Sequence, residues 1–325
     1  MIEDPGHSPL FSAAYAAWLL AQRASNVVQR YVLMLERTRD LWLQRQGDHP
    51  LAEIGPDAVR HWLLWLQGGD PDCGIPAPHG KRTERISGAY VDIQFRNIKA
   101  FFTWTEEEEV VYRSPMRKVK RPRFEERLPE ALSEAEADEL LHKVKTNGDR
   151  HAYRDYCIFL LFLDTGVRLA ELVRLDVDHV NLVEGYAKVY GKGRRERIVP
   201  VGVELRQAIS LYLLKHREAV KGETALFVNE HGLRLESRGV SSTVIRDLNH
   251  YVARKLNHYG PHTLRHTSIT FRLRKTRDLK TTSLISGHST TRTTERYVHL
   301  TGADVLRDAA GSAMDDIVRN RAGKR

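Results

Sequence analysis

The sequence predicts a mainly helical protein of two domains, in which the second domain also contains a small β-hairpin. Three observations indicate this fold class. Apolar residues recur at three- and four-residue spacing through most of 10–110, as on amphipathic helices. A segment rich in Pro, Lys and Arg then interrupts this pattern before helical periodicity resumes. Further along, two β-prone arms flank the short stretch "GKGRR", as expected for a hairpin.

Four helices are expected in the first domain. The stretches "LFSAAYAAWLLAQRAS" and "NVVQRYVLMLERTRDLWLQRQ" carry the helical apolar pattern, and Pro56 suits the first position of a third helix. The glycine- and proline-rich "GGDPDCGIPAPHGK" is predicted to be a loop. The fourth helix, "SGAYVDIQFRNIKAFFTWTEEEE", places four large apolar side chains on one stripe: Val91, Phe95, Ile98 and Phe102.

A basic segment separates the two domains. From Arg117 to Arg123, five of seven residues are Lys or Arg, and prolines stiffen the path. This composition predicts an extended linker that follows a phosphate backbone, although a plain solvated linker fits it too. Ser133 and Glu136 then have the spacing of a capping box at a new helix. The expected boundaries are a helical domain at 8–117, a linker at 118–131, a second domain at 132–302 and a tail at 303–325.

The bulk composition restricts the partners and the compartment. The 325 residues carry a net charge of +9, and 41% are hydrophobic, which is enough for a packed core. A polyanion such as nucleic acid is the simplest partner, although a basic enzyme whose charge only aids solubility also fits. Two cysteines, Cys73 and Cys157, provide no disulfide framework and indicate a reducing cytoplasm. No stretch reaches the ~20 apolar residues of a membrane span, so we expect no membrane association.

Chemistry-bearing residues gather in four stretches of the second domain. In "DTGVRLAELVRL", Gly166 permits a tight turn, and Arg168 and Glu171 have the spacing of a shared helix face. A surface ion pair is an equally open interpretation of that spacing. At the hairpin tip, Lys192 lies between glycines without the spacing of a nucleotide-binding loop. A lysine on a two-stranded ribbon is suited to a nucleic-acid groove, so DNA contact is predicted here.

The stretch "PHTLRHT" brings histidines together with Arg265. His262 and His266 lie four residues apart and, with His288 of "SGHSTTRTTERYVHL", suggest a zinc site. The HExxH pattern is absent, no carboxylate lies nearby in sequence, and Arg265 would repel a cation, so we expect no metal. Tyr297 follows His288 by nine residues among polar neighbours, and we expect its side chain to be accessible.

Together these stretches contain two guanidiniums, an ammonium, two imidazoles and a phenol, without the acidic cluster of a two-metal site. Guanidiniums bind phosphate oxygens bidentately and stabilise the charge of a pentacoordinate phosphate. A tyrosine can attack phosphorus to form a covalent intermediate. Its ordinary pKa is about 10, so nearby positive charge must favour its ionised form.

The motifs "TGVRLAEL", "YGKGRRERIVPV", "PHTLRHT" and "SGHSTTRTTERYVH", in this order, resemble those of the tyrosine recombinases, the phage integrase family. The helical first domain resembles the family's SAM-like core-binding domain, and 132–302 its mixed α+β catalytic domain. Two stretches depart from the family pattern: "RLRKTRDLK" replaces a glycine-containing turn, and "SLISGH" puts Ser286 at a usually apolar position. These departures concern helix packing and not the catalytic set.

The resemblance implies a role for each catalytic residue. Arg168 and Arg265 would clamp the scissile phosphate, with Glu171 orienting the cluster. Tyr297 would form a 3′-phosphotyrosine link, which a different 5′ hydroxyl then resolves. Because the ester conserves the bond energy, neither ATP nor a metal ion nor another cofactor is implied.

The remaining roles follow from the same resemblance. Lys192 would protonate the departing 5′ hydroxyl, His262 would assist proton transfer, and His288 would hydrogen-bond the phosphate. We also expect a set of basic residues to contact the DNA backbone: Arg85, Arg96, Lys99, Arg117, Lys118, Lys120, Arg121, Arg123, Arg194 and Arg195.

The expected function is therefore site-specific recombination or integration of double-stranded DNA by a homo-tetramer, or paired recombinases, passing through a Holliday junction. We expect a cytoplasmic, nucleoid-associated enzyme of Xer-like two-domain size. Two alternatives remain open at this point: a type IB topoisomerase that relaxes DNA, and a DNA-binding protein with an inactive site. The tail at 303–325 would dock on a neighbouring protomer or fold back on its own domain.

Overall fold

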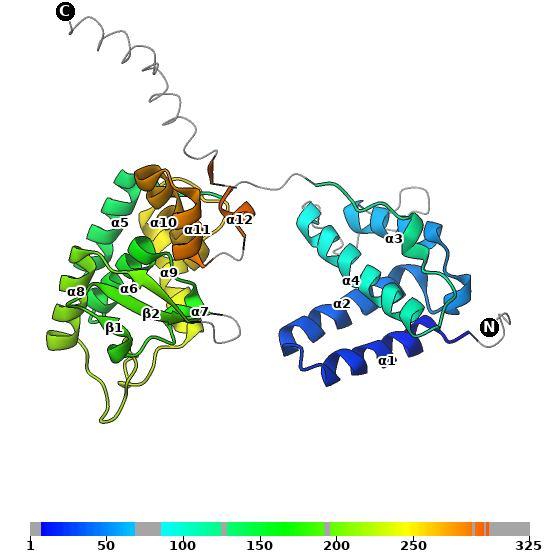
Figure 1. Cartoon of the computed structure of the whole chain (residues 1–325), viewed down its shortest axis with the longest axis horizontal. Coiled ribbons are helices and arrows are strands. Elements are labelled where there is room, and N and C mark those ends of the chain that lie inside the picture. Colours follow the sequence, from blue (N-terminus) through cyan, green and yellow to red (C-terminus); the bar gives the residue numbers. More distant parts are fainter. Residues whose placement is uncertain are drawn as a thin grey trace, which may run out of the picture. The chain divides into compact units, whose positions relative to one another are not determined.

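The computed structural model describes residues 8–68, 86–124, 129–191, 196–287, 290–295 and 297–298. The chain divides into two compact units, Met1–Arg127 (unit 1) and Leu128–Arg325 (unit 2), which are considered separately (Figure 1). The division falls inside the segment predicted as a linker, 118–131. Among the described residues, no helix combines the length and the apolar character needed to span a membrane.

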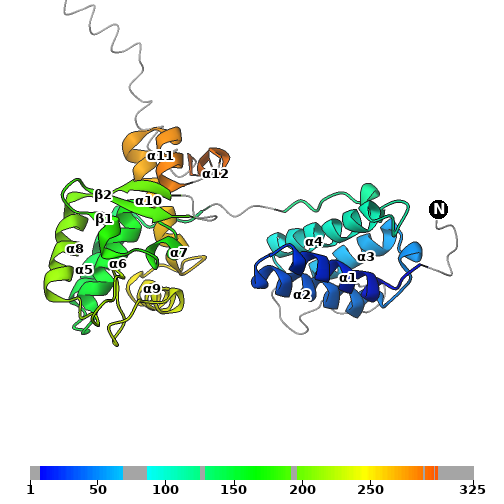
Figure 2. The ribbon, with the colours of Figure 1, turned by 60° about the horizontal axis from the view of Figure 1, so that its bottom comes forward.

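The regular elements in the described part of unit 1 are all helices. Its helices pack along one another around a shared core (Figure 2). Ser87 caps the last of the four α-helices by accepting a hydrogen bond from the backbone of Tyr90. The third begins at Pro56, as the sequence predicts. The elements are α1 (Phe11–Ala24), α2 (Gln29–Gln46), η2 (Leu51–Glu53), α3 (Pro56–Gly68), α4 (Gly88–Glu107) and η3 (Pro115–Lys118).

Aromatic rings from three helices form the centre of this core. Phe11 of α1 stacks on Trp42 of α2, with 5.0 Å between ring centroids and 19° between planes. The same ring meets Phe101 of α4 edge-on at 5.2 Å and 73°. All three side chains are almost completely buried. Because each buried aromatic removes a large apolar area from water, these contacts are a major source of stability for unit 1.

The first part of the predicted linker is packed onto unit 1 and does not extend freely from it. Val119 joins the core together with Met116. The backbone carbonyl of Lys118 accepts a hydrogen bond from Nη2 of Arg60 at 2.9 Å. Arg121 forms two bonds to Asp92 of α4, at 2.5 and 2.8 Å. Residues 118–121 of the predicted linker thus have contacts to unit 1 because Val119 reaches the core and Arg121 pairs with Asp92, while the linker bounds of 118–131 remain a prediction.

Unit 2 combines a helical core with a three-stranded antiparallel sheet in the order β1-β2-β3. The capping box predicted for Ser133 and Glu136 is present at the start of α5. The elements are α5 (Glu134–Thr146), α6 (Ala152–Thr165), α7 (Leu169–Leu172), η4 (Val177–His179), β1 (Val180–Asn181), β2 (Tyr186–Tyr190), β3 (Glu196–Pro200), α8 (Val203–Lys215), α9 (Ser237–Tyr251), α10 (Pro261–Thr276), α11 (Leu279–Ser286) and α12 (Arg292–Glu295).

The predicted hairpin arms are β2 and β3, and their register pairs Val189 with Arg197 and Lys188 with Ile198. Since side chains alternate between the two faces of a strand, Arg197 lies on the inward face with buried Val199, and Ile198 points to solvent. Apolar residues from α5, α6, α8, α9 and the sheet form one continuous core. The mainly helical fold with a small antiparallel sheet is thus confirmed.

Candidate active site

Arg168 lies at the turn between α6 and α7. Gly166 ends α6 in the left-handed conformation, at φ +64°, and an added Cβ there would meet Ser268 Oγ at 3.1 Å. Arg168 then occupies the position before α7. Its backbone N–H donates to Glu171 Oε2 at 2.7 Å, and its Nη1 donates to Oε1 at 3.1 Å. The pair is not a surface ion pair, since Glu171 is only 2% exposed.

Glu171 is the carboxylate that connects two arginines. Besides Arg168, it binds Arg197 of β3 through two bonds, from Nη1 at 2.5 Å and from Nη2 at 2.9 Å. Burial by itself would raise the pKa of Glu171, but the hydrogen bonds from Arg197 and from the Arg168 backbone outweigh it and lower that pKa below its ordinary range. Glu171 is therefore ionised at neutral pH.

Arg265 is the most deeply buried of these guanidiniums. Its side chain projects from α10, and the residue is 5% exposed. Nη1 donates to the carbonyl of Gly166, and Nη2 donates to the carbonyl of Ser286 at 2.6 Å. Burial and the neighbouring charge of Arg168 lower the pKa of Arg265 to about 10, so it remains a cation at neutral pH. Arg168 and Arg265 are thus neighbours, as the resemblance implies for a phosphate clamp.

Three arginines converge on the C-terminal end of α11. Three consecutive backbone carbonyls there each accept from a different guanidinium. Nε of Arg197 binds Ile285 O at 3.2 Å, Nη2 of Arg265 binds Ser286 O, and Nη2 of Arg168 binds Gly287 O at 2.7 Å. A helix C-terminus carries partial negative charge and favours cations. We call Arg168, Arg197 and Arg265 the arginine cluster.

Tyr297 lies next to α10, but its side chain is not accessible as the sequence suggested. The residue is 3% exposed and its ring packs against Ile269, Leu273 and Leu279. Its hydroxyl is hydrogen-bonded to Nδ1 of His266. The prediction of an exposed tyrosine was wrong because the apolar neighbours come from α10 and α11 and not from adjacent residues. The hydroxyl nevertheless remains close enough to Arg265 to interact electrostatically with it.

His262 lies in the first turn of α10, one turn before His266, with 6.3 Å between the ring centroids. Burial lowers the pKa of His262, and the charges of Arg265, His258 and Arg168 lower it further. The imidazole is therefore neutral at neutral pH. It is placed beside the arginine cluster in a form that can accept a proton.

Several predicted residues lie outside the described residues: Lys192, Arg194 and Arg195 at the hairpin tip, His288 after α11, Arg85 before α4, and the tail at 303–325. Of the other predicted DNA contacts, Lys99, Lys118, Lys120 and Arg123 are exposed. Arg96 and Arg121 both pair with Asp92, and Arg117 pairs with Glu106 at 2.8 Å. Three of the cations predicted to meet DNA thus already have acidic partners.

Two residues of this site are absent from the catalytic set predicted from the sequence. Arg197 is not singled out in the sequence, and His266 was considered only as a zinc ligand. The alternation along β3, in which Arg197 shares a face with Val199, is the signal that indicates an inward arginine. For His266, the sequence contains no comparable signal, since its partner Tyr297 is 31 residues away.

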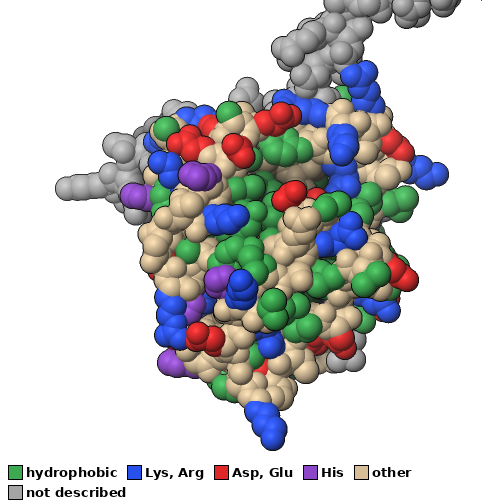
Figure 3. Space-filling view, turned by 90° about the vertical axis from the view of Figure 1, so that its left-hand side faces the viewer, with side chains coloured by type: hydrophobic (Ala, Val, Ile, Leu, Met, Phe, Trp, Pro, Cys, Tyr) green, Lys and Arg blue, Asp and Glu red, His purple; other side chains and the backbone are tan. Residues whose placement is uncertain are grey.

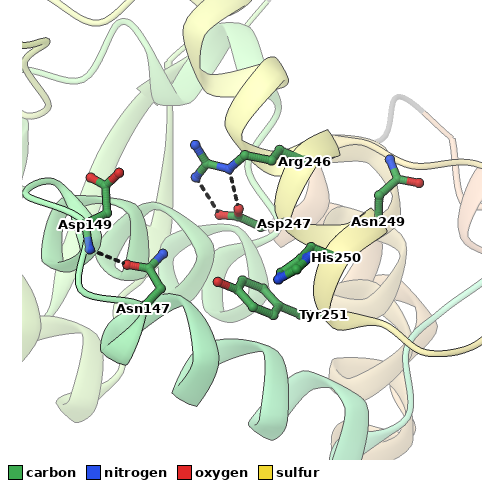
Figure 4. A pocket seen from close by; sticks show the side chains of 7 residues that line it. All are labelled: Asn147, Asp149, Arg246, Asp247, Asn249, His250 and Tyr251. Atoms are coloured by element: carbon green, nitrogen blue, oxygen red, sulfur yellow. Dashed lines mark hydrogen bonds and ion pairs between the residues drawn. The ribbon is translucent and has the colours of Figure 1, made fainter.

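Other polar features of unit 2 lie apart from the arginine cluster. A pocket of about 630 Å³ is lined by α9 and by the residues after α5, with Arg246 bonded to Asp247 at its wall (Figure 4). Within the described residues, Asp176, Asp178 and His179 have metal-ligand spacing, but Asp176 is bound by Arg234. The face in Figure 3 intersperses basic, acidic and apolar side chains and carries no uniformly basic surface.

The family profile and the relatives found by comparison with known proteins agree with one another. The sequence profile of the phage integrase family matches residues 130–303. The chain is 33% identical over 213 residues to the tyrosine recombinase XerD of Staphylococcus epidermidis, covering 64% of this chain and 70% of that protein. It is 34% identical over 276 residues to the tyrosine recombinase XerC of Pelotomaculum thermopropionicum, covering 81% and 84%.

Solved structures share the fold. A crystal structure of the XerH site-specific recombinase bound to a palindromic difH substrate superposes with a TM-score of 0.70 at 17% identity, covering 89% of this chain and 82% of that one. The Tn1549 transposon integrase in complex with transposon right end DNA gives a TM-score of 0.71 at 19% identity, covering 93% and 98%.

Proposed function

Because the chain belongs to the phage integrase family and is a site-specific tyrosine recombinase, we propose that it cuts and rejoins DNA through a 3′-phosphotyrosine link on Tyr297. DNA is its substrate. The curated relatives are named recombinases, so relaxation of supercoils as the main activity, or a DNA-binding protein without activity, is not favoured.

The observation that carries the proposal is that Arg168 and Arg265 donate to the neighbouring carbonyls of Gly287 and Ser286, and that Arg265 interacts electrostatically with Tyr297. A guanidinium has five N–H donors. The hydrogen bonds within the described residues use two donors of Arg168 and two of Arg265. The remaining donors of the two arginines can bind the oxygens of one phosphodiester and stabilise the charge of its pentacoordinate transition state.

The proposed reaction begins with attack of the Tyr297 oxygen on phosphorus. The bond to the 5′ oxygen breaks, and Lys192 protonates that leaving group. His262, which is neutral, accepts the proton of the tyrosine, and His288 hydrogen-bonds a phosphate oxygen. For the attack, the hydroxyl must leave His266 and its ring must leave the apolar cluster. A second 5′ hydroxyl then attacks the phosphotyrosine and restores the phosphodiester.

The first unit is proposed to hold the DNA backbone through its basic residues, with 132–302 as the catalytic domain. Lys99, Lys118, Lys120 and Arg123 are exposed and suited to phosphate contact. Arg96, Arg117 and Arg121 would exchange carboxylates for phosphates. We propose a homo-tetramer, or a complex with a paired recombinase, that exchanges strands through a Holliday junction on nucleoid DNA.

A covalent trapping experiment tests this function. The protein is isolated from its own cells under denaturing conditions, and the DNA attached to it is digested, quantified and sequenced. We expect the wild type to retain DNA ending in a 3′ phosphate on Tyr297, and Tyr297→Phe to bind DNA without forming the adduct. Tyr112→Phe is the matched control, since Tyr112 is 98% exposed and lies in unit 1. An adduct that persists in Tyr297→Phe would contradict the proposal.

A further inference from the structure

Arg197 is an inward-facing cation in a strand that is otherwise half open to solvent. Its side chain is 16% exposed, whereas its neighbours Glu196 and Ile198 are exposed. A charged side chain is buried at this depth only when its donors are matched by acceptors. The structure supplies three acceptor atoms to Arg197, and they come from two different elements of the site.

The contacts of Arg197 join β3 to α7 and to the end of α11. Its two terminal nitrogens bind the two oxygens of Glu171 at 2.5 and 2.9 Å, which is a bidentate arrangement. Its Nε donates to Ile285 O at 3.2 Å. The same two oxygens of Glu171 bind the side chain and the backbone of Arg168. Arg197 therefore acts on Arg168 through a shared carboxylate.

The absence of a side chain at Gly287 is a second indication that the end of α11 accommodates the Arg197 guanidinium. Its φ is +65°, in the left-handed region that favours glycine. A Cβ at this position would lie 2.8 Å from Nε and 2.9 Å from Cζ of Arg197. Any larger residue would have to displace the guanidinium. The carbonyl of the same glycine accepts from Arg168 at 2.7 Å, so the turn is shaped around both arginines.

We propose that Arg197 is a positioning residue of the recombinase reaction, which fixes the Glu171 carboxylate and the end of α11 so that Arg168 is held in place for the phosphate. It does not touch the phosphate itself. This inference rests on the function proposed above. A lysine cannot replace it fully, because an ammonium lacks the planar fork that binds both carboxylate oxygens.

The effect of Arg197 on Glu171 is measurable without DNA. Hydrogen bonding from Arg197 is the largest influence that lowers the pKa of Glu171. In Arg197→Gln the carboxyl is still buried and keeps Arg168 but loses the cation of Arg197, so its pKa should rise. Carbon-13 NMR titration of the side-chain carboxyls, with Glu171→Asp to identify the resonance, reports this change. An unchanged titration of Glu171 in Arg197→Gln overturns the inference.

The rate of adduct formation provides the second test. Single-turnover adduct formation is measured across a pH series on DNA carrying the site recovered by trapping. We expect Arg197→Gln to slow adduct formation by roughly tenfold, which is the size of effect typical of residues that interact directly with one another. The affinity for DNA should be unchanged, because Arg197 does not touch the phosphate. The decline of the rate toward acid pH should also begin at a higher pH than in the wild type. Arg197→Lys should recover part of the rate.

Matched controls separate positioning from loss of folding. Arg217→Gln removes another half-buried arginine, which donates to the carbonyls of Glu223 and Ala225 away from the cluster, and should leave the pH profile unchanged.

A double substitution tests whether Arg197 acts through Glu171. In a Glu171→Gln background, Arg197→Gln should reduce the rate little further, since the effect of Arg197 on Arg168 passes through the Glu171 carboxylate. Full additivity, or a wild-type rate and pH profile in Arg197→Gln, overturns the inference. Failure of the wild type to form any adduct counts instead against the proposed function, while the NMR titration still decides on Arg197.

Discussion

The hydroxyl of Tyr297 is hydrogen-bonded to Nδ1 of His266, which directly follows Arg265 in α10. The residue proposed as nucleophile is thus held by an imidazole inside an apolar cluster, close enough to Arg265 to interact electrostatically with it. In this geometry the hydroxyl of Tyr297 is engaged inside the protein, and attack on phosphorus requires its hydrogen bond to be exchanged.

Removal of the His266 imidazole is expected to make Tyr297 more accessible. In His266→Leu the hydroxyl loses a hydrogen-bond partner in a buried position, which costs about 1–3 kcal/mol and favours conformations in which the ring is exposed. Nitration by tetranitromethane, followed residue by residue with mass spectrometry, should proceed severalfold faster at Tyr297. The exposed Tyr112 serves as the internal reference. Equal nitration rates at Tyr297 in both proteins would argue against this role of the imidazole.

Arg168 and Arg265 are expected to differ in their effect on stability but not in their effect on activity. Arg265→Ala leaves two buried carbonyls, Gly166 O and Ser286 O, without a donor, and should lower the free energy of unfolding by about 2–4 kcal/mol. The side chain of Arg168 is 39% exposed, so water can replace it in Arg168→Ala, at a cost of about 1 kcal/mol or less.

Urea unfolding measures the effect of each substitution on stability. Adduct formation measures the effect on activity, and both substitutions should abolish it. A stability loss for Arg168→Ala as large as that for Arg265→Ala would contradict the burial argument.

His262 is expected to make folding sensitive to mild acid. Its pKa is 6.5 in the ordinary case and is lower in the folded protein, chiefly because of burial. Between these two pKa values the unfolded chain binds a proton that the folded chain does not, so stability is lost as the pH falls through this window. His262→Gln should therefore lose less stability than the wild type between about pH 7.5 and about pH 5.5.

The matched control is His231→Gln, since the His231 side chain is 75% exposed. If the wild type and His262→Gln lose the same free energy of unfolding over this pH range, the pKa of His262 is not lowered in the folded protein.

Lys192 is predicted to protonate the leaving group, although it lies outside the described residues. Lys192→Ala should slow cleavage of normal DNA by about a hundredfold or more. A substrate with a 5′ sulfur leaving group needs no proton, and its cleavage should be restored in the same variant. Lys188→Ala, on β2 of the same hairpin, should affect neither substrate. Slow cleavage of the sulfur substrate by Lys192→Ala would remove Lys192 from the acid role.

Features that depend on neighbouring residues in the chain were predictable from the sequence. The capping box at Ser133 and Glu136, the start of α3 at Pro56 and the hairpin arms follow from local pattern. The sequence also indicated that glycine is missing after α10. The structure has Arg277 in the left-handed conformation there, at φ +54°, so the turn is kept by a residue that adopts it at some cost.

Features that depend on contacts between distant segments were not predictable in the same way. Polar neighbours in sequence indicated an exposed Tyr297, but Ile269 and Leu273 of α10 bury it. The inward direction of Arg197 became clear only once its contacts with Glu171 and Ile285 were known. In both cases the environment of the side chain is set by tertiary packing, which local periodicity does not record.

Asp92 holds both Arg96 and Arg121 on unit 1. If these arginines contact phosphates as proposed, each contact replaces an existing ion pair, and the vacated carboxylate attracts sodium or potassium ions of its own. The net number of counterions released when DNA binds is then smaller than the number of phosphates engaged. The number of phosphate contacts calculated from the salt dependence of the affinity would accordingly be lower than the number that the protein makes.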